Sequence, residues 1–146
     1  MNAMPLSAAE KMNVLTRCVV FAGIPSRDLS VLAEMMTTER LSAQEVLFEK
    51  GDPSDSVFVV ADGKLGIFLD PAGKPVRILG PGELLGEYGM FIGLFRTATV
   101  RADSSAVLLS LDYQRFRAFL LQFPQSALVL MKIAVQRLVA AESARR

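Results

Sequence analysis

The chain has 146 residues, which suits one domain with a hydrophobic core. Apolar residues make up 51% and charged residues 21%, as in soluble globular proteins. Sixteen basic and fifteen acidic residues leave a net charge of +1, so we expect no nucleic-acid partner. The N-terminus does not resemble a secretory signal, and polar residues interrupt the most apolar stretch, 118–135, so we expect no membrane span.

The residue types also limit the chemistry. The sequence has no histidine, which excludes Ser/His and Cys/His nucleophile pairs and the usual zinc and non-haem iron ligand sets. Carboxylate chemistry stays open, but no acidic pair is arranged for it. Cys18, the single cysteine, lies among apolar residues and is interpreted as a core residue in a reducing, cytoplasmic compartment. We therefore expect no enzyme, no catalytic residue and no metal.

The first third of the chain predicts two helices. Ser7 and Glu10 have the spacing of a capping box, which begins a helix. The break at 23–25 ends this helical region. Ser26 is expected to cap a second helix, whose apolar face carries Leu29, Leu32, Ala33 and Met36.

From Glu39 to Tyr113 the pattern changes to short apolar runs separated by Gly, Pro and Asp. Asp62-Gly63 between two such runs predicts a hairpin. Many short strands with evenly spaced turns favour a sandwich, roll or barrel. The candidate strands are 39–41, 46–49, 56–61, 64–69, 76–79, 98–101 and 106–112.

After Tyr113 the pattern is helical again. A short helix is expected over 115–121, and Pro124 suits the first turn of a long helix that reaches about Ala144. Its apolar residues Leu128, Met131, Val135 and Leu138 repeat at helical spacing. We expect this apolar stripe to pack on the β-rich block, although it could instead meet a second copy of the chain and form a homodimer.

The segment from Leu84 to Val100 carries the functional signal. Gly86 would let backbone approach a ligand closely, and Glu87 could accept hydrogen bonds from sugar hydroxyls. A helical turn over 88–92 would attract an anion at its N-terminus. Arg96 supplies a planar cation suited to phosphate oxygens. Taken singly, the glutamate and the arginine are more often surface charges or an ion pair, so the prediction rests on the whole string.

Two separated patterns in this sequence resemble one family. Leu85-Gly86-Glu87, an apolar turn and Arg96-Thr97-Ala98 resemble the phosphate-binding cassette of cyclic-nucleotide-binding domains, found in catabolite-activator-type regulators, protein kinase A regulatory subunits and nucleotide-gated channels. A second, earlier pattern matches the hairpins of the same family and comprises Gly51, Asp55, Phe58, Val60, Gly63 and Leu65. The resemblance covers about residues 18–139.

The resemblance implies a mainly β fold with flanking helices. This fold is an antiparallel β-roll, a jelly-roll-like double-stranded β-helix, with N-terminal helices and a long C-terminal helix. The whole chain, 1–146, is expected to form one domain, with helices over about 7–37, the roll over about 39–112 and helices over about 114–144.

The resemblance also implies a role for each site residue. Glu87 accepts a hydrogen bond from the ribose 2′-hydroxyl, and Arg96 pairs with the cyclic phosphate of cAMP or cGMP. The backbone of Gly86 and Ala98, with the Thr97 hydroxyl, completes the phosphate cradle. Leu85 and Val76 lie near the base, which Leu138 or its neighbour Arg137 covers. Glu87 and Arg96 are expected to neutralise each other in the empty site.

The expected function is a sensor without catalysis, which moves its C-terminal helix when ligand binds and reports to an unknown protein partner. The terminal pair Arg145-Arg146 is too short to bind DNA. The chain is expected to be either a full protein that reports to a partner or a piece of a longer protein. Phe95, where the family usually has proline, and Gly89, which would loosen the turn, favour one alternative: a degenerate roll that serves as an interaction or scaffold module. An enzyme on a related roll, such as a cupin, would need histidine ligands.

Overall fold

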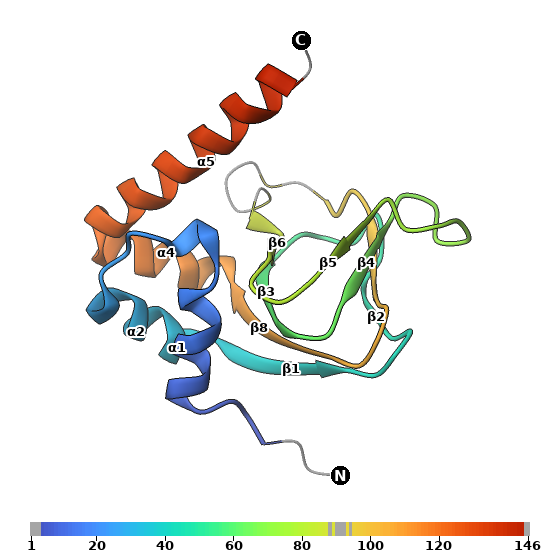
Figure 1. Cartoon of the computed structure of the whole chain (residues 1–146), viewed down its shortest axis with the longest axis horizontal. Coiled ribbons are helices and arrows are strands. Elements are labelled where there is room, and N and C mark those ends of the chain that lie inside the picture. Colours follow the sequence, from blue (N-terminus) through green and yellow to red (C-terminus); the bar gives the residue numbers. More distant parts are fainter. Residues whose placement is uncertain (1–3, 88, 90–92, 94, 145–146) are drawn as a thin grey trace.

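A computed structural model describes residues 4–87, 89, 93 and 95–144. Within these residues, eight antiparallel strands form two four-stranded sheets, with helices before and after them (Figure 1). The expected β-roll with flanking helices is therefore confirmed. The elements are α1 (Ala8–Thr16), η1 (Val19–Phe21), α2 (Ser26–Met35), β1 (Thr37–Leu41), β2 (Val46–Phe48), β3 (Ser56–Asp62), β4 (Leu65–Phe68), β5 (Arg77–Leu79), β6 (Leu84–Leu85), β7 (Thr99–Ala102), β8 (Ala106–Asp112), α4 (Tyr113–Gln122) and α5 (Pro124–Ala144).

The two sheets have strand orders β1-β8-β3-β6 and β2-β7-β4-β5. The strands that flank Asp62-Gly63 lie in different sheets, because β3 pairs with β8 and β6 while β4 pairs with β5 and β7. The predicted hairpin is therefore wrong: the turn carries the chain from one sheet to the other. Gly63 has a φ of 80°, and an added Cβ would lie 2.2 Å from the Ser105 carbonyl oxygen, so only glycine fits there.

Of the two N-caps predicted for the N-terminal helices, the structure has one. The Ser7–Glu10 capping box at the start of α1 is confirmed, since the Ser7 side chain accepts from the Glu10 N–H and the Glu10 carboxylate accepts from the Ser7 N–H. The expected cap at Ser26 is wrong. Pro25 is the N-cap of α2, because its carbonyl already accepts from the Leu29 N–H at 2.9 Å, and no side chain of the described part of the chain caps this helix.

The core has two parts because β3 is buried on both faces. Val57 and Val59 point toward the helices, whereas Phe58 and Val60 point into the roll. Cys18 belongs to the helical part and is 1% exposed, which confirms its interpretation as a core residue. Burial raises the pKa of its thiol above the usual value, so this cysteine is kept in its neutral form.

The C-terminal helices begin as their sequences indicate. Asp112 caps α4 through the Arg115 N–H at 2.8 Å, so this helix starts two residues before the predicted Arg115. Pro124 begins α5, as predicted. Among the described residues no single helix is long and apolar enough to cross a membrane; α4 and α5 satisfy that criterion only as a pair bent by 115°.

The first turns of α5 are buried against the rest of the molecule, and its outer turns extend away with mostly exposed side chains (Figure 1). Ser126 and Leu130 are buried, and Ser126 donates a 2.9 Å hydrogen bond to the Asp28 carboxylate of α2. The prediction that the apolar stripe packs on the roll is wrong. Its four residues are 52–67% exposed: Leu128, Met131, Val135 and Leu138.

Candidate functional site

Strand β6 and the glycine after it set the position of the predicted cassette. Leu85 pairs with Phe58 of β3, which fixes the start of the segment against the roll. Gly86 then turns the chain with a φ of 92°. An added Cβ would lie 2.6 Å from the Ser56 carbonyl oxygen and 2.9 Å from Nη1 of Arg96, so the close approach requires glycine. The predicted helical turn over 88–92 lies outside the described residues, apart from Gly89.

Arg96 reaches the site as a buried cation. Its backbone N–H donates to the Asp52 carbonyl at 2.7 Å, and its carbonyl accepts from the Gly51 N–H at 2.8 Å. These bonds hold the arginine next to the loop before β3. Its side chain is 5% exposed. The local backbone therefore positions a guanidinium inside the roll rather than on its surface.

The Arg96 guanidinium has an incomplete set of partners. Nη2 donates to the Ser56 carbonyl at 3.1 Å and lies 3.6 Å from the Asp55 carboxylate. The group stacks over Phe48, with 4.1 Å to the ring centroid. Nε is buried and has no hydrogen-bond partner among the described residues. A buried donor without an acceptor is costly, so this end of the site favours an anion.

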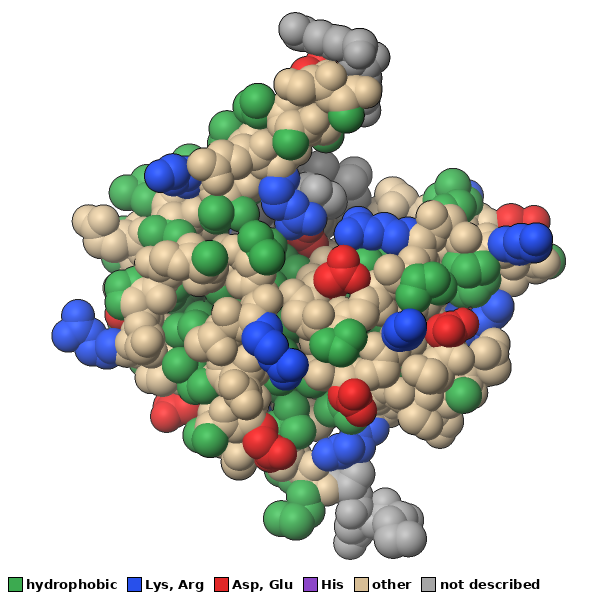
Figure 2. Space-filling model, in the orientation of Figure 1, with side chains coloured by type: hydrophobic (Ala, Val, Ile, Leu, Met, Phe, Trp, Pro, Cys, Tyr) green, Lys and Arg blue, Asp and Glu red, His purple; other side chains and the backbone are tan. Residues whose placement is uncertain are grey.

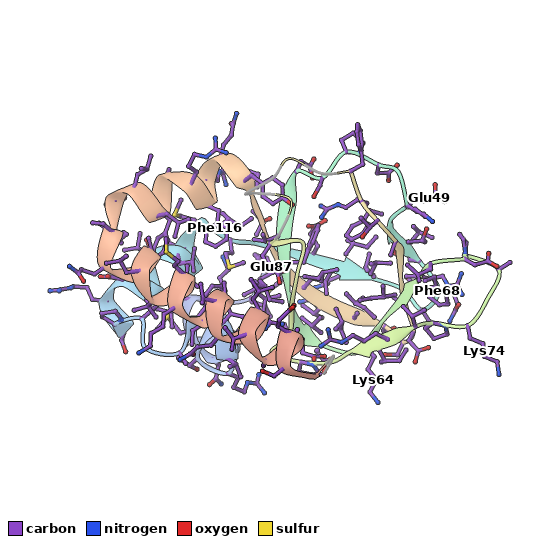
Figure 3. All side chains as sticks on the ribbon, turned by 90° about the horizontal axis from the view of Figure 1, so that it is seen from above. Glu49, Lys64, Phe68, Lys74, Glu87 and Phe116 are labelled. Atoms are coloured by element: carbon purple, nitrogen blue, oxygen red, sulfur yellow. The ribbon has the colours of Figure 1, made fainter. Side chains whose placement is uncertain are left out.

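Glu87 lies between α5 and the strands of the roll (Figure 3). Burial raises the pKa of its carboxyl above the usual value, and Arg137 and Arg77 offset part of that effect. The carboxylate forms an ion pair with Arg137 of α5 at 3.9 Å, whereas Arg96 forms one with Asp55. The two charges thus have separate partners and do not form the mutual pair that the sequence suggested.

These groups surround a cavity of about 480 Å³, a size in the range of small-molecule sites. Six of the eight predicted site residues line it: Leu85, Gly86, Glu87, Arg96, Thr97 and Ala98. Val76 and Leu138 do not; they are 59% and 67% exposed. Their neighbours Arg77 and Arg137 line the cavity in their place. The other lining residues are Phe48, Ser54, Ile67, Leu79, Leu84, Gly89, Phe95 and Val100.

A comparison of the sequence with models of protein families identifies the family that has this fold. The model described as "Cyclic nucleotide-binding domain" matches residues 38–123. This chain belongs to the cyclic nucleotide-binding domain family. The matched region begins at the second residue of β1, ends just after α4, and includes strands β2 to β8 and the whole cassette.

Two solved structures resemble this cyclic nucleotide-binding domain over most of its length. The N-terminal domain of a transcriptional regulator from Streptomyces coelicolor A3(2) is 31% identical, with a TM-score of 0.80 over 91% of this chain and 95% of that one. Catabolite Activator Protein of Thermus thermophilus is 25% identical, with a TM-score of 0.74 over 86% of this chain and 60% of that one.

Among curated proteins, a cyclic nucleotide-gated potassium channel of Mesorhizobium japonicum is 34% identical over 118 residues. The match covers 79% of this chain and 32% of the channel. The chain spans less than a third of the length of the curated relatives it matches first. In these relatives the domain is one part of a larger protein.

Sequence reasoning missed residues that line or support the domain's cavity. Phe48 ends β2, and nothing in its local pattern indicates that its ring lies under the Arg96 guanidinium. Tyr113, the first residue of α4, donates a short hydrogen bond to the Gly86 carbonyl and forms another with the Ser54 hydroxyl. Both contacts join segments far apart in the sequence, so only the fold reveals them.

Gly89 also has a role that its helix propensity did not suggest. An added Cβ would lie 2.3 Å from the Ser54 hydroxyl and 2.5 Å from the Tyr113 hydroxyl. Glycine at this position therefore makes room for the hydrogen bonds between Ser54, Tyr113 and Gly86. Of the two departures that favoured a degenerate roll, Gly89 and Phe95, this packing accounts for Gly89.

Proposed function

We propose that this domain binds a cyclic nucleotide, cAMP or cGMP, without catalysing a reaction, and that binding regulates a protein partner by moving α5. One observation carries the proposal: the buried Arg96 guanidinium on the cavity wall, with its Nε unpartnered among the described residues. A cyclic phosphate carries one negative charge and oxygen acceptors. It would supply the acceptor that the buried donor lacks.

The other cavity residues fit the rest of such a ligand. Gly86 and the small residue Ala98 let the backbone come close to a phosphate between them. The Glu87 carboxylate provides acceptors for sugar hydroxyls. Ile67, Leu79 and Leu84 offer apolar surface to the flat faces of a base. The cavity thus combines one buried cation, one carboxylate and an apolar wall.

The output in this proposal starts at the ion pair between Glu87 and Arg137. A sugar that engages Glu87 changes the ion pair that joins the cassette to the outer part of α5. The ligand can move α5 only by its different affinity for the two helix positions. The base of α5 stays fixed by Ser126 and Leu130, so we expect rotation about this end.

The test is isothermal titration calorimetry of the nucleotide-free chain with cAMP and with cGMP. We expect a dissociation constant in the micromolar range or below for at least one of them. Arg96→Ala should weaken binding at least about tenfold, because each charged hydrogen bond contributes about 1.5–3 kcal/mol. Arg96→Lys keeps the charge but loses the planar fork, and should also bind more weakly.

Arg117→Ala is the matched control, because Arg117 is an exposed arginine of α4 outside the cavity. It should bind as the unchanged chain does. Thermal unfolding of each variant checks that it is folded. If the folded, unchanged chain binds neither nucleotide, the proposal fails and the interaction-module alternative takes its place.

A further inference from the structure

We infer that the cavity selects a guanine base, so that cGMP binds more tightly than cAMP; this inference rests on the proposed function. It starts from the cations of the cavity. Among the described residues, three arginines and one carboxylate, that of Glu87, line it. A cyclic mononucleotide brings one negative charge, which Arg96 would neutralise. Two arginines, Arg77 and Arg137, are left for another part of the ligand.

The three arginines lie at two different ends of the cavity. Arg137 lies 3.9 Å from the Glu87 carboxylate, and both Arg137 and Arg77 lower the pKa of that carboxyl, whereas Arg96 pairs with Asp55. Arg77 and Arg137 therefore share the Glu87 end, and Arg96 occupies the buried end beside Phe48. The side chains of Arg77 and Arg137 are 58% and 45% exposed, compared with 5% for that of Arg96. Basic side chains are visible at this mouth, in the hollow beneath α5 (Figure 2).

A bound nucleotide would extend from the buried end toward this mouth. With the phosphate on Arg96 and the sugar on Glu87, the base comes next to Arg77 and Arg137. Each of these arginines now pairs with one glutamate: Arg77 with Glu83 at 3.2 Å, and Arg137 with Glu87 at 3.9 Å. The Arg77–Glu83 pair is exposed and therefore weak, and the Arg137–Glu87 pair is longer than a hydrogen bond, so both guanidinium groups can turn toward a ligand.

A guanidinium donates hydrogen bonds and accepts none. The edge of guanine that carries N7 and O6 presents two acceptors, which match an arginine fork. The same edge of adenine presents the N7 acceptor beside the N6 amino donor, which a guanidinium cannot receive. Among the described lining side chains the acceptors are the Glu87 carboxylate, which the sugar engages, and the hydroxyls of Ser54 and Thr97, which adjoin Asp55 and Arg96 at the phosphate end. The chemistry of the mouth therefore favours guanine.

The experiment titrates the full chain with cGMP, cAMP and cyclic inosine monophosphate. The last nucleotide keeps O6 and N7 but lacks the 2-amino group of guanine. We expect cGMP and cyclic inosine monophosphate to bind with similar affinity, each about tenfold more tightly than cAMP. Arg77→Met with Arg137→Met keeps aliphatic length and removes the donors, so the preference should fall to about threefold or less. Arg117→Met should keep the preference.

Each other outcome contradicts a specific claim. Equal affinities, or tighter binding of cAMP, would overturn the guanine assignment and leave the proposed function standing. A cGMP preference that survives in the double variant would show that Arg77 and Arg137 do not read the base. Weak binding of cyclic inosine monophosphate would place the selectivity on the 2-amino group. No binding of any of the three would overturn the proposed function itself.

Discussion

At the scale of single residues, two glycines with the same backbone conformation have different surroundings. Gly51 and Gly86 have φ angles of 94° and 92°. A Cβ on Gly51 would meet nothing within 4 Å, whereas a Cβ on Gly86 would lie 2.6 Å from the Ser56 carbonyl oxygen. Alanine substitutions at Gly51 and Gly86 therefore separate two losses of stability: the one from a left-handed backbone and the one from a close backbone contact.

We predict that Gly51→Ala lowers the free energy of unfolding by about 1–2 kcal/mol, the cost of a left-handed conformation for a residue with a Cβ. Gly86→Ala should cost about 1–3 kcal/mol more, because the backbone of β3 must also shift. Urea denaturation of both variants measures the difference. Equal losses of stability would contradict the close approach of Gly86 to Ser56.

At the scale of elements, the buried hydrogen bond from Ser126 to Asp28 fixes the base of α5 on α2. Ser126→Ala leaves the carboxylate without this donor, so we predict a loss of about 1–3 kcal/mol in the free energy of unfolding. Ser30→Ala is the matched control, because the Ser30 hydroxyl donates to the Arg27 carbonyl in an exposed hydrogen bond within α2. It should cost less than about 0.5 kcal/mol.

A double-mutant cycle tests whether the two groups act as one contact. Asp28→Ala together with Ser126→Ala should cost less than the sum of the single changes, because neither polar group is then left unpaired. Additive losses would show that the hydrogen bond does not hold the helix.

The elements predicted correctly are those with local signals. The capping box at Ser7 and the proline at Pro124 each involve neighbouring residues, and both helix starts are confirmed. Strand β6 was missed because Leu84 and Leu85 are too few to show a period. The turn at Asp62-Gly63 was predicted correctly, but the hairpin predicted around it does not form. Strands β3 and β4 pair with strands that are distant in the sequence, which a local pattern does not reveal.

At the scale of the whole molecule, the sequence identified which charges matter and misassigned their partners. Glu87 and Arg96 were expected to pair, yet each binds a residue of a different segment, Arg137 and Asp55. Helical periodicity likewise found the apolar stripe of α5 but could not say what covers it. Periodicity reports which residues share a face, whereas burial depends on where the helix lies in the fold.

The exposed outer half of α5 leads to a prediction about the whole domain. Buried contacts fix its first turns, and the ion pair from Arg137 to Glu87 is the contact that a bound sugar would replace. We predict that cyclic nucleotide shortens the distance between spin labels at Ser143, near the end of α5, and Lys74, in the loop between β4 and β5. Pulsed electron resonance in a Cys18→Ala background measures this distance.

Two controls separate helix movement from other effects. A label pair at Glu39 and Lys74 joins two points of the roll, so its distance should not change with ligand. Arg96→Ala in the Ser143 and Lys74 pair should remove the response at the same nucleotide concentration, because a ligand shifts the helix only through binding. An unchanged distance at saturating nucleotide, with binding confirmed by calorimetry, would mean that α5 keeps its position and that the signal leaves the domain by another element.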